Sequence, residues 1–167
     1  MRHDSDFAAY MTARWPALVR TLVLLGSPQP EAEEIARQGL ARCYLGWSRV
    51  RESLDIDVEV YRTVLDVLGR ARARVGGRAA GSPETPASSG ATQVVEPTDA
   101  VLLRIALEEA LDGLPVEQRE VVVLRYVAGL VEPQISALLG VPEDEVESSL
   151  ATARDRLDLE RLWEAPR

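Results

Sequence analysis

Apolar residues recur every three or four positions along most of the chain, which is the spacing of one face of an α-helix. In the N-terminal half, this spacing and the prolines at 16, 28 and 30 predict four helices, at about residues 5–15, 16–26, 31–47 and 56–75. No run of alternating apolar and polar residues longer than four indicates a strand. We therefore expect an all-α protein.

Residues 76–99 interrupt the helical pattern. Gly, Pro, Ser, Ala and Thr dominate this segment, and Val94 and Val95 are its only large apolar residues. Such a composition cannot offset the entropy lost on ordering, so it is typical of a flexible linker. The sequence thus predicts two small helical domains, at residues 1–75 and 100–160, joined by a flexible linker at 76–99.

The C-terminal half predicts helices at 99–112, 115–129, 132–139 and 143–160. The last two are separated by Gly140, Val141 and Pro142, which favour a tight turn. Short amphipathic helices joined by such a turn are typical of a helix-turn-helix DNA reader.

The charge pattern conflicts with this interpretation. Residues 1–75 carry a net charge of +1, whereas residues 76–167 carry −9. The helix expected to enter the major groove begins with four carboxylates within five residues, Glu143, Asp144, Glu145 and Glu147. Duplex DNA carries one negative charge per about 1.7 Å, so these groups repel it. They could complement the helix dipole, or they could form an acidic surface for an Arg-rich partner.

Other features narrow the class of protein. The single cysteine, Cys43, rules out an intrachain disulfide and fits a cytoplasmic protein. Apolar runs such as Leu22–Leu25 are far short of the ~20 residues that span a bilayer. The sequence contains no Ser-His-Asp set, metal-ligand spacing or phosphate-binding loop. We expect no enzyme activity, cofactor, metal site or small-molecule substrate.

The two predicted domains and the linker resemble a bacterial RNA polymerase sigma factor of the extracytoplasmic-function type, in its short actinobacterial subgroup. In the N-terminal domain the resemblance lies in residues 14–26, 31–44 and 46–51. In the C-terminal domain it lies in Leu114-Pro115, Gln118-Arg119, Leu124-Arg125-Tyr126, Gly129-Leu130, Leu139-Gly140, Val146, Ala153 and Leu157. The two domains then correspond to sigma regions 2 and 4.

This resemblance implies that the chain binds core RNA polymerase and promoter DNA, and that an anti-sigma factor is a possible partner. It places a polymerase contact on the third predicted helix, at Glu34, Arg37 and Arg42. It places DNA contacts at Arg70, Arg72, Arg74, Ser148, Ser149, Arg154 and Arg156. Each cation also has a plain structural interpretation, because cations suit a helix C-terminus and pair with neighbouring carboxylates.

Several positions depart from the family pattern. Glu34 and Arg37 stand where an Asp and a Gln are usual, and the Asn expected near Val67 is absent. The usual Glu-Ile-Ala of region 4 is Gln134-Ile135-Ser136. Three usual cations of the recognition helix are replaced by Glu147, Ser149 and Thr152.

Two hypotheses follow from this pattern. The first is a working sigma factor, for which polymerase supplies most of the affinity for the promoter. The second is a degenerate sigma-like protein that has lost DNA reading and acts by binding an anti-sigma factor or the polymerase.

Overall fold

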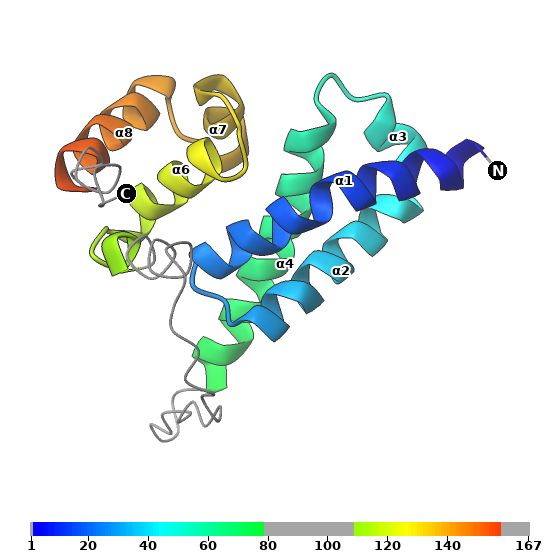
Figure 1. Cartoon of the computed structure of the whole chain (residues 1–167), viewed down its shortest axis with the longest axis horizontal. Coiled ribbons are helices and arrows are strands. Elements are labelled where there is room, and N and C mark those ends of the chain that lie inside the picture. The colour runs from blue at the N-terminus through cyan, green and yellow to red at the C-terminus, as the bar shows by residue number, and fades with distance from the viewer. Residues whose placement is uncertain (1, 79–108, 158–167) are drawn as a thin grey trace, which may run out of the picture.

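The computed structural model describes residues 2–78 and 109–157, and the regular secondary structure in these ranges is helical (Figure 1). The N-terminal lobe consists of α1 (Arg2–Leu24), α2 (Gln29–Leu45), α3 (Trp47–Arg51) and α4 (Ile56–Arg78). In the C-terminal lobe, residues 109–112 are helical and precede α6 (Val116–Tyr126), α7 (Glu132–Leu139) and α8 (Glu143–Leu157). The predicted all-α class is confirmed.

The first two predicted helices are one helix. α1 continues through Pro16, where the prediction placed a helix start. Proline removes one backbone hydrogen bond and disfavours a helix interior. Phe7 and Tyr10 before the proline and Leu18 and Leu22 after it pack on the same core, and this packing outweighs the local cost.

The short helix α3 was not predicted, and it brings Trp47 into the centre of the N-terminal lobe. Trp47 is 2% exposed, as predicted from its apolar neighbours. The rings of Phe7 and Tyr10 lie 5.2 and 5.3 Å from it, in the tilted and edge-on arrangements that aromatic pairs prefer. Trp15, also predicted to be in the core, is only partly buried.

α2 packs between α1 and α4. Gly39 makes the close approach to α4 possible, because a Cβ atom there would lie 2.6 Å from Val64 Cγ2. Cys43, one turn further along α2, is buried as predicted. The position of Gly39 therefore sets how closely these two helices approach.

The predicted linker is only partly described. α4 runs through Arg78, three residues beyond the predicted domain boundary at 75. Residues 79–99 of the linker lie outside the described residues, as does most of the helix predicted at 99–112. The domain boundaries therefore stay predictions.

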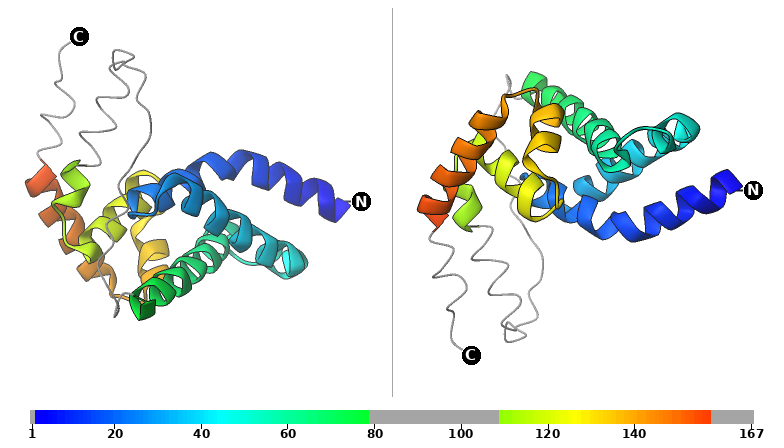
Figure 2. Two further views of the ribbon diagram at one scale, coloured as in Figure 1. Left: turned by 90° about the horizontal axis from the view of Figure 1, so that it is seen from below. Right: turned by 90° about the horizontal axis from the view of Figure 1, so that it is seen from above.

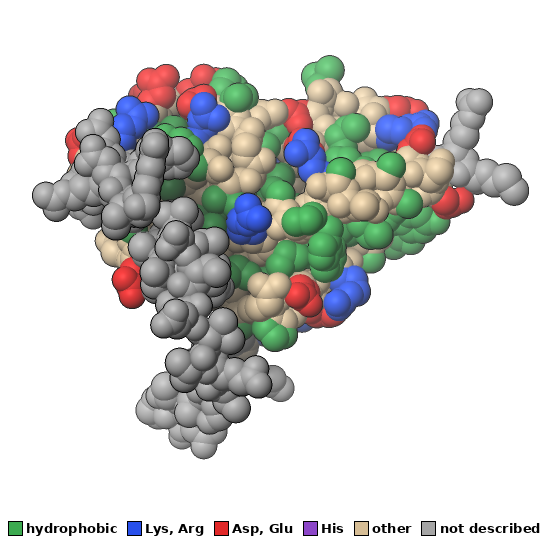
Figure 3. Space-filling view, in the orientation of Figure 1, with side chains coloured by type: hydrophobic (Ala, Val, Ile, Leu, Met, Phe, Trp, Pro, Cys, Tyr) green, Lys and Arg blue, Asp and Glu red, His purple; other side chains and the backbone are tan. Residues whose placement is uncertain are grey.

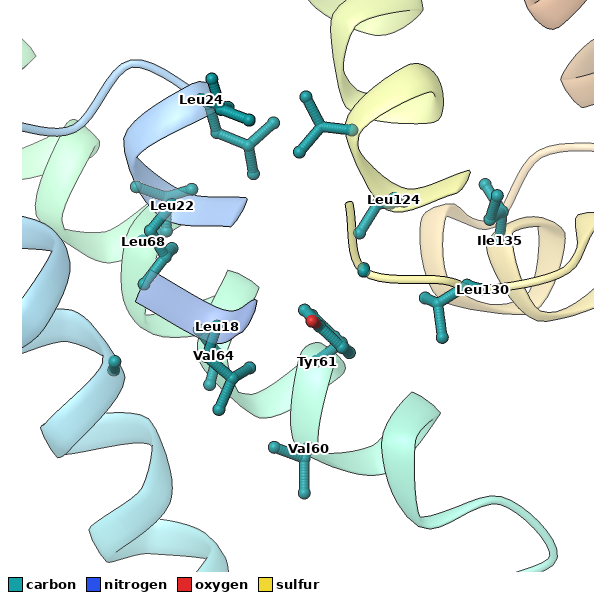
Figure 4. Packing of buried hydrophobic residues seen from close by; sticks show 14 of the residues in the cluster. Leu18, Leu22, Leu24, Val60, Tyr61, Val64, Leu68, Leu124, Leu130 and Ile135 are labelled. Carbon is teal, nitrogen blue, oxygen red and sulfur yellow. The ribbon is translucent and has the colours of Figure 1, made fainter. Parts of the chain in front are cut away.

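The two lobes lie side by side (Figures 1 and 2). α4 contacts α7, and the end of α1 contacts α6. Figure 4 shows Tyr61 of α4 between aliphatic residues of the N-terminal lobe and Leu124 and Leu130 of the C-terminal lobe, and all of these residues belong to one buried cluster. The lobes thus share an apolar contact.

Candidate nucleic-acid and polymerase surfaces

α7, the turn at 140–142 and α8 form the predicted helix-turn-helix. Gly140 ends α7 with a φ of 71°, a left-handed conformation that glycine adopts without strain. The Ser136 hydroxyl donates a hydrogen bond of 2.6 Å to the Val141 carbonyl across the turn. Ser136 therefore stabilises this turn, which an Ala at the same position could not do.

The start of α7 is held by two side chains. Gln134 Oε1 accepts a hydrogen bond of 2.8 Å from the Val131 backbone N–H, which satisfies one of the free donors at a helix N-terminus. Arg125 at the end of α6 pairs with Glu132, with 3.1 Å between Nε and Oε1. These two contacts stabilise the orientation of α7 relative to α6.

α8 turns its apolar stripe inward and its acids outward. Val146, Leu150 and Ala153 are buried, and Glu143, Asp144, Glu145 and Glu147 are exposed. Figure 3 shows acidic side chains gathered over the start of this helix. The start of α8, which in a recognition helix faces DNA, therefore presents negative charge.

The predicted DNA contacts on α8 lie further along the helix. Ser148 and Arg154 are exposed, and Ser149 is half-buried. The side chain of Arg156 lies outside the described part of the chain. Arg154 is therefore the predicted cation that the structure places on the exposed surface of α8.

The three predicted DNA-binding arginines of α4 are not equivalent. Arg70 pairs with Asp66 at 2.7 Å, and Arg74 is exposed. Arg72 instead donates a hydrogen bond of 2.5 Å to the Leu25 carbonyl and lies 3.5 Å from Glu120 of the C-terminal lobe. Arg72 thus takes part in the contact between the lobes, whereas Arg70 and Arg74 do not contact the C-terminal lobe in the hydrogen bonds and ion pairs described.

The predicted polymerase-binding residues lie on the exposed side of α2. Glu34 and Arg37 form an ion pair one turn apart, with half or more of each side chain exposed. Arg42 lies 3.8 Å from Asp66 of α4. Glu34, Arg42, Arg70 and Arg74 line one depression between α2 and α4. The structure therefore brings predicted polymerase and DNA residues together on one face.

An apolar groove between α1 and α2 was missed at the sequence level. It is lined by Phe7, Met11, Trp15, Arg37, Leu40, Ala41 and Tyr44. Figure 3 shows exposed apolar side chains along this boundary. Phe7, Met11 and Trp15 recur every four residues within the helix predicted at 5–15, so their common face could have been found, but the sequence does not show that α2 packs beside this face.

The described residues contain neither a membrane-spanning helix nor a cluster of metal-binding side chains. Within residues 2–78 and 109–157, no helix is both long and apolar enough to cross a membrane. The same ranges contain no group of three or more His, Cys, Asp or Glu side chains placed to hold a metal ion.

Comparison with known proteins agrees with this architecture. Residues 104–157 match the family described as Sigma-70, region 4. Over 155 residues, covering 91% of this chain and 84% of the relative, the sequence is 27% identical to the RNA polymerase sigma-E factor of Streptomyces coelicolor. The helix-turn-helix of α7 and α8 is thus that of a sigma-70 region 4 domain.

Solved structures share the fold over nearly the whole chain. The sigma factor RpoE, in complex with the anti-sigma factor NepR from Bartonella quintana, superposes with a TM-score of 0.70 at 20% identity, covering 97% of this chain and 99% of that one. CnrH, in complex with the cytosolic domain of CnrY, gives 0.64 at 18% identity, covering 97% and 91%. The chain is thus similar to a sigma factor over most of its length, and residues 104–157 carry the match to Sigma-70, region 4.

Proposed function

We propose that this protein is a sigma factor that binds core RNA polymerase in the cytoplasm and directs it to promoter DNA. The observation that carries the proposal is the region 4 match over residues 104–157, within a relationship to a sigma-E factor that covers 91% of the chain. The function consists of binding and positioning, and no catalytic residue takes part in it.

The exposed side of α2 is the proposed polymerase surface. Arg37 lines the apolar groove between α1 and α2, and it forms an ion pair with Glu34, which lines the depression between α2 and α4. A polar rim around an apolar centre is the usual composition of a protein interface. Tyr44 and Met11, 40% and 37% exposed, supply the apolar part.

Both lobes contribute to the proposed DNA surface, and the C-terminal lobe contributes weakly. Arg70, Arg74 and Arg154 are exposed and are the proposed phosphate contacts, whereas the acids at the start of α8 repel phosphates. Bound polymerase holds the lobe at the promoter at high effective concentration, so weak affinity of the lobe itself is compatible with promoter reading.

A second candidate function is favoured by the exposed acids of α8. A degenerate sigma-like protein that has lost DNA reading would keep its scaffold and its protein-binding surfaces. It would act by occupying the polymerase or an anti-sigma factor. One structural relative is bound to an anti-sigma factor, which supports such a partner for this chain under either candidate.

The deciding experiment is capture of core RNA polymerase by the full-length protein, followed by run-off transcription from fragments of genomic DNA. A sigma factor captures the polymerase and yields discrete transcripts. Capture without transcripts favours the sigma-like candidate. Absence of capture, with protein that is folded by circular dichroism, contradicts the polymerase-binding proposal.

A further inference from the structure

Two polar contacts join α7 of the helix-turn-helix to the N-terminal lobe, one at Asp55, the residue before α4, and one at Arg62 in the first half of α4. The Gln134 side-chain amide donates a hydrogen bond to Asp55 Oδ2. Arg62 Nη2 donates one of 3.3 Å to the Ala137 carbonyl. Tyr61 of α4 also makes an apolar contact with the C-terminal lobe (Figure 4). The helix-turn-helix is therefore held against the N-terminal lobe by both polar and apolar groups.

The orientation of the Gln134 amide follows from its other hydrogen bond. Its Oε1 accepts from the Val131 backbone N–H, which can only donate, so its NH₂ group must point toward Asp55. Asp55 is likewise occupied on one side, since its Oδ1 accepts from the Val58 backbone N–H at 3.1 Å. Each side chain thus caps its own helix with one atom and meets the other lobe with the second.

The chemistry of this contact depends on residue 134 being Gln. A Glu at this position would cap the helix start in the same way. A Glu here would place a carboxylate against the carboxylate of Asp55, replacing a charge-assisted hydrogen bond by a repulsion. Gln at position 134 therefore permits a contact between the lobes that Glu would oppose.

We propose that the Asp55–Gln134 pair is an autoinhibitory contact that holds the helix-turn-helix against the N-terminal lobe. It places a carboxylate at the first turn of α7, the helix that crosses the DNA backbone in helix-turn-helix readers. The positive end of a helix is also where a phosphate binds best, so Asp55 competes with DNA there. This inference rests on the proposed function, because it is promoter binding that the contact restrains.

The test exchanges donor and acceptor without disturbing either cap. Gln134→Glu keeps the acceptor for Val131 but opposes Asp55. Asp55→Asn keeps the cap of α4, since Asn is as good an N-cap as Asp, but turns an NH₂ toward the NH₂ of Gln134. The double variant restores a donor facing a carboxylate and has the same net charge as the unchanged protein. Each single variant is expected to raise the fraction of open molecules about tenfold, and the double variant to reverse this.

The distance between the lobes is measured in the full chain by pulsed electron spin resonance between labels at Ser48→Cys and Ala151→Cys, both exposed positions. Cys43 is buried, and burial raises the pKa of its thiol, so it reacts poorly with the label. Longer distances in both single variants and the native distribution in the double variant are the expected result. Unchanged single variants, or a double variant as open as they are, would overturn the proposal.

Run-off transcription with the same variants separates this inference from the proposed function. If the lobes separate in the single variants and these variants transcribe more than the double variant, the autoinhibitory contact and the proposed function are both supported. If they open and no variant captures polymerase, the contact is real but the proposed function is wrong. If they open and transcription does not change, the contact exists but is not autoinhibitory, and the proposal fails.

Discussion

Gly39 lies where α2 and α4 approach each other closely. Gly39→Ala would push a Cβ atom against Val64, including its backbone Cα at 3.1 Å, so α2 and α4 must separate. We expect the free energy of unfolding to fall by about 1–3 kcal/mol, as for other overpacked sites. Thermal denaturation followed by circular dichroism measures this loss.

A matched control for this substitution lies on α4. A Cβ atom at Gly69 would meet no atom within 4 Å, so Gly69→Ala tests helix propensity alone. It should raise the free energy of unfolding by up to about 1 kcal/mol. Two glycines with the same local preference then respond in opposite directions. Equal responses would mean that α2 and α4 do not approach as closely as described.

Among the single elements, α8 has the position of a DNA-recognition helix but an acidic surface that opposes DNA binding. Restoring the usual cations, as Glu147→Lys with Ser149→Arg and Thr152→Arg, should raise the affinity of the full-length protein for duplex DNA. It should also steepen the salt dependence, since each added phosphate contact releases counterions. The buried stripe of Val146, Leu150 and Ala153 is untouched, so the fold should tolerate the changes. Fluorescence anisotropy at two salt concentrations gives both quantities.

The control for α8 carries the same change in net charge elsewhere. Glu109→Lys with Glu117→Lys alters two exposed carboxylates outside α8. A general increase in positive charge would raise DNA affinity equally in both variants. Micromolar, salt-sensitive binding by the unchanged protein would contradict the view that the acids of α8 weaken DNA binding.

α2 offers a similar test for polymerase binding. Exchanging Glu34 and Arg37 keeps their ion pair, one turn apart, but reverses the charges that the helix presents. Polymerase binding should weaken several-fold, while the melting temperature stays within a few degrees because exposed pairs contribute little. Exchanging Asp6 and Arg51, an exposed pair between α1 and α3, is the control. Unchanged binding after the first exchange would place the polymerase contact elsewhere.

For the whole molecule, the predicted linker at 76–99 and the contact between the lobes lead to a joint expectation. A broad-specificity protease should cut first beyond Arg78, where α4 ends, and not within residues 31–75. The two fragments should then elute together from a sizing column, because both lobes contribute to one buried apolar cluster. Mass spectrometry locates the cut. First cleavage inside α2 or α4 would contradict the two-domain prediction.

Much of the architecture could be predicted from local patterns. α7 has the predicted bounds, because its apolar spacing, Pro133 and Gly140 all act within one or two turns. The burial of Trp47 and Cys43 followed from apolar neighbours in the same way. The break predicted at Pro16 was wrong, because packing on both sides of the proline overrides its local preference.

Most of the helices, the two helical lobes and the acidic start of α8 could be predicted from residues near one another in the chain. The break at Pro16 and the missed helix α3 are the exceptions. Only the tertiary structure decided that Arg72 faces the other lobe, that Arg42 and Arg70 meet at Asp66, and that Gln134 meets Asp55. These pairs form between helices distant in sequence or depend on which face of a helix is covered. Periodicity locates such a face, but the packing of the lobes selects its partner.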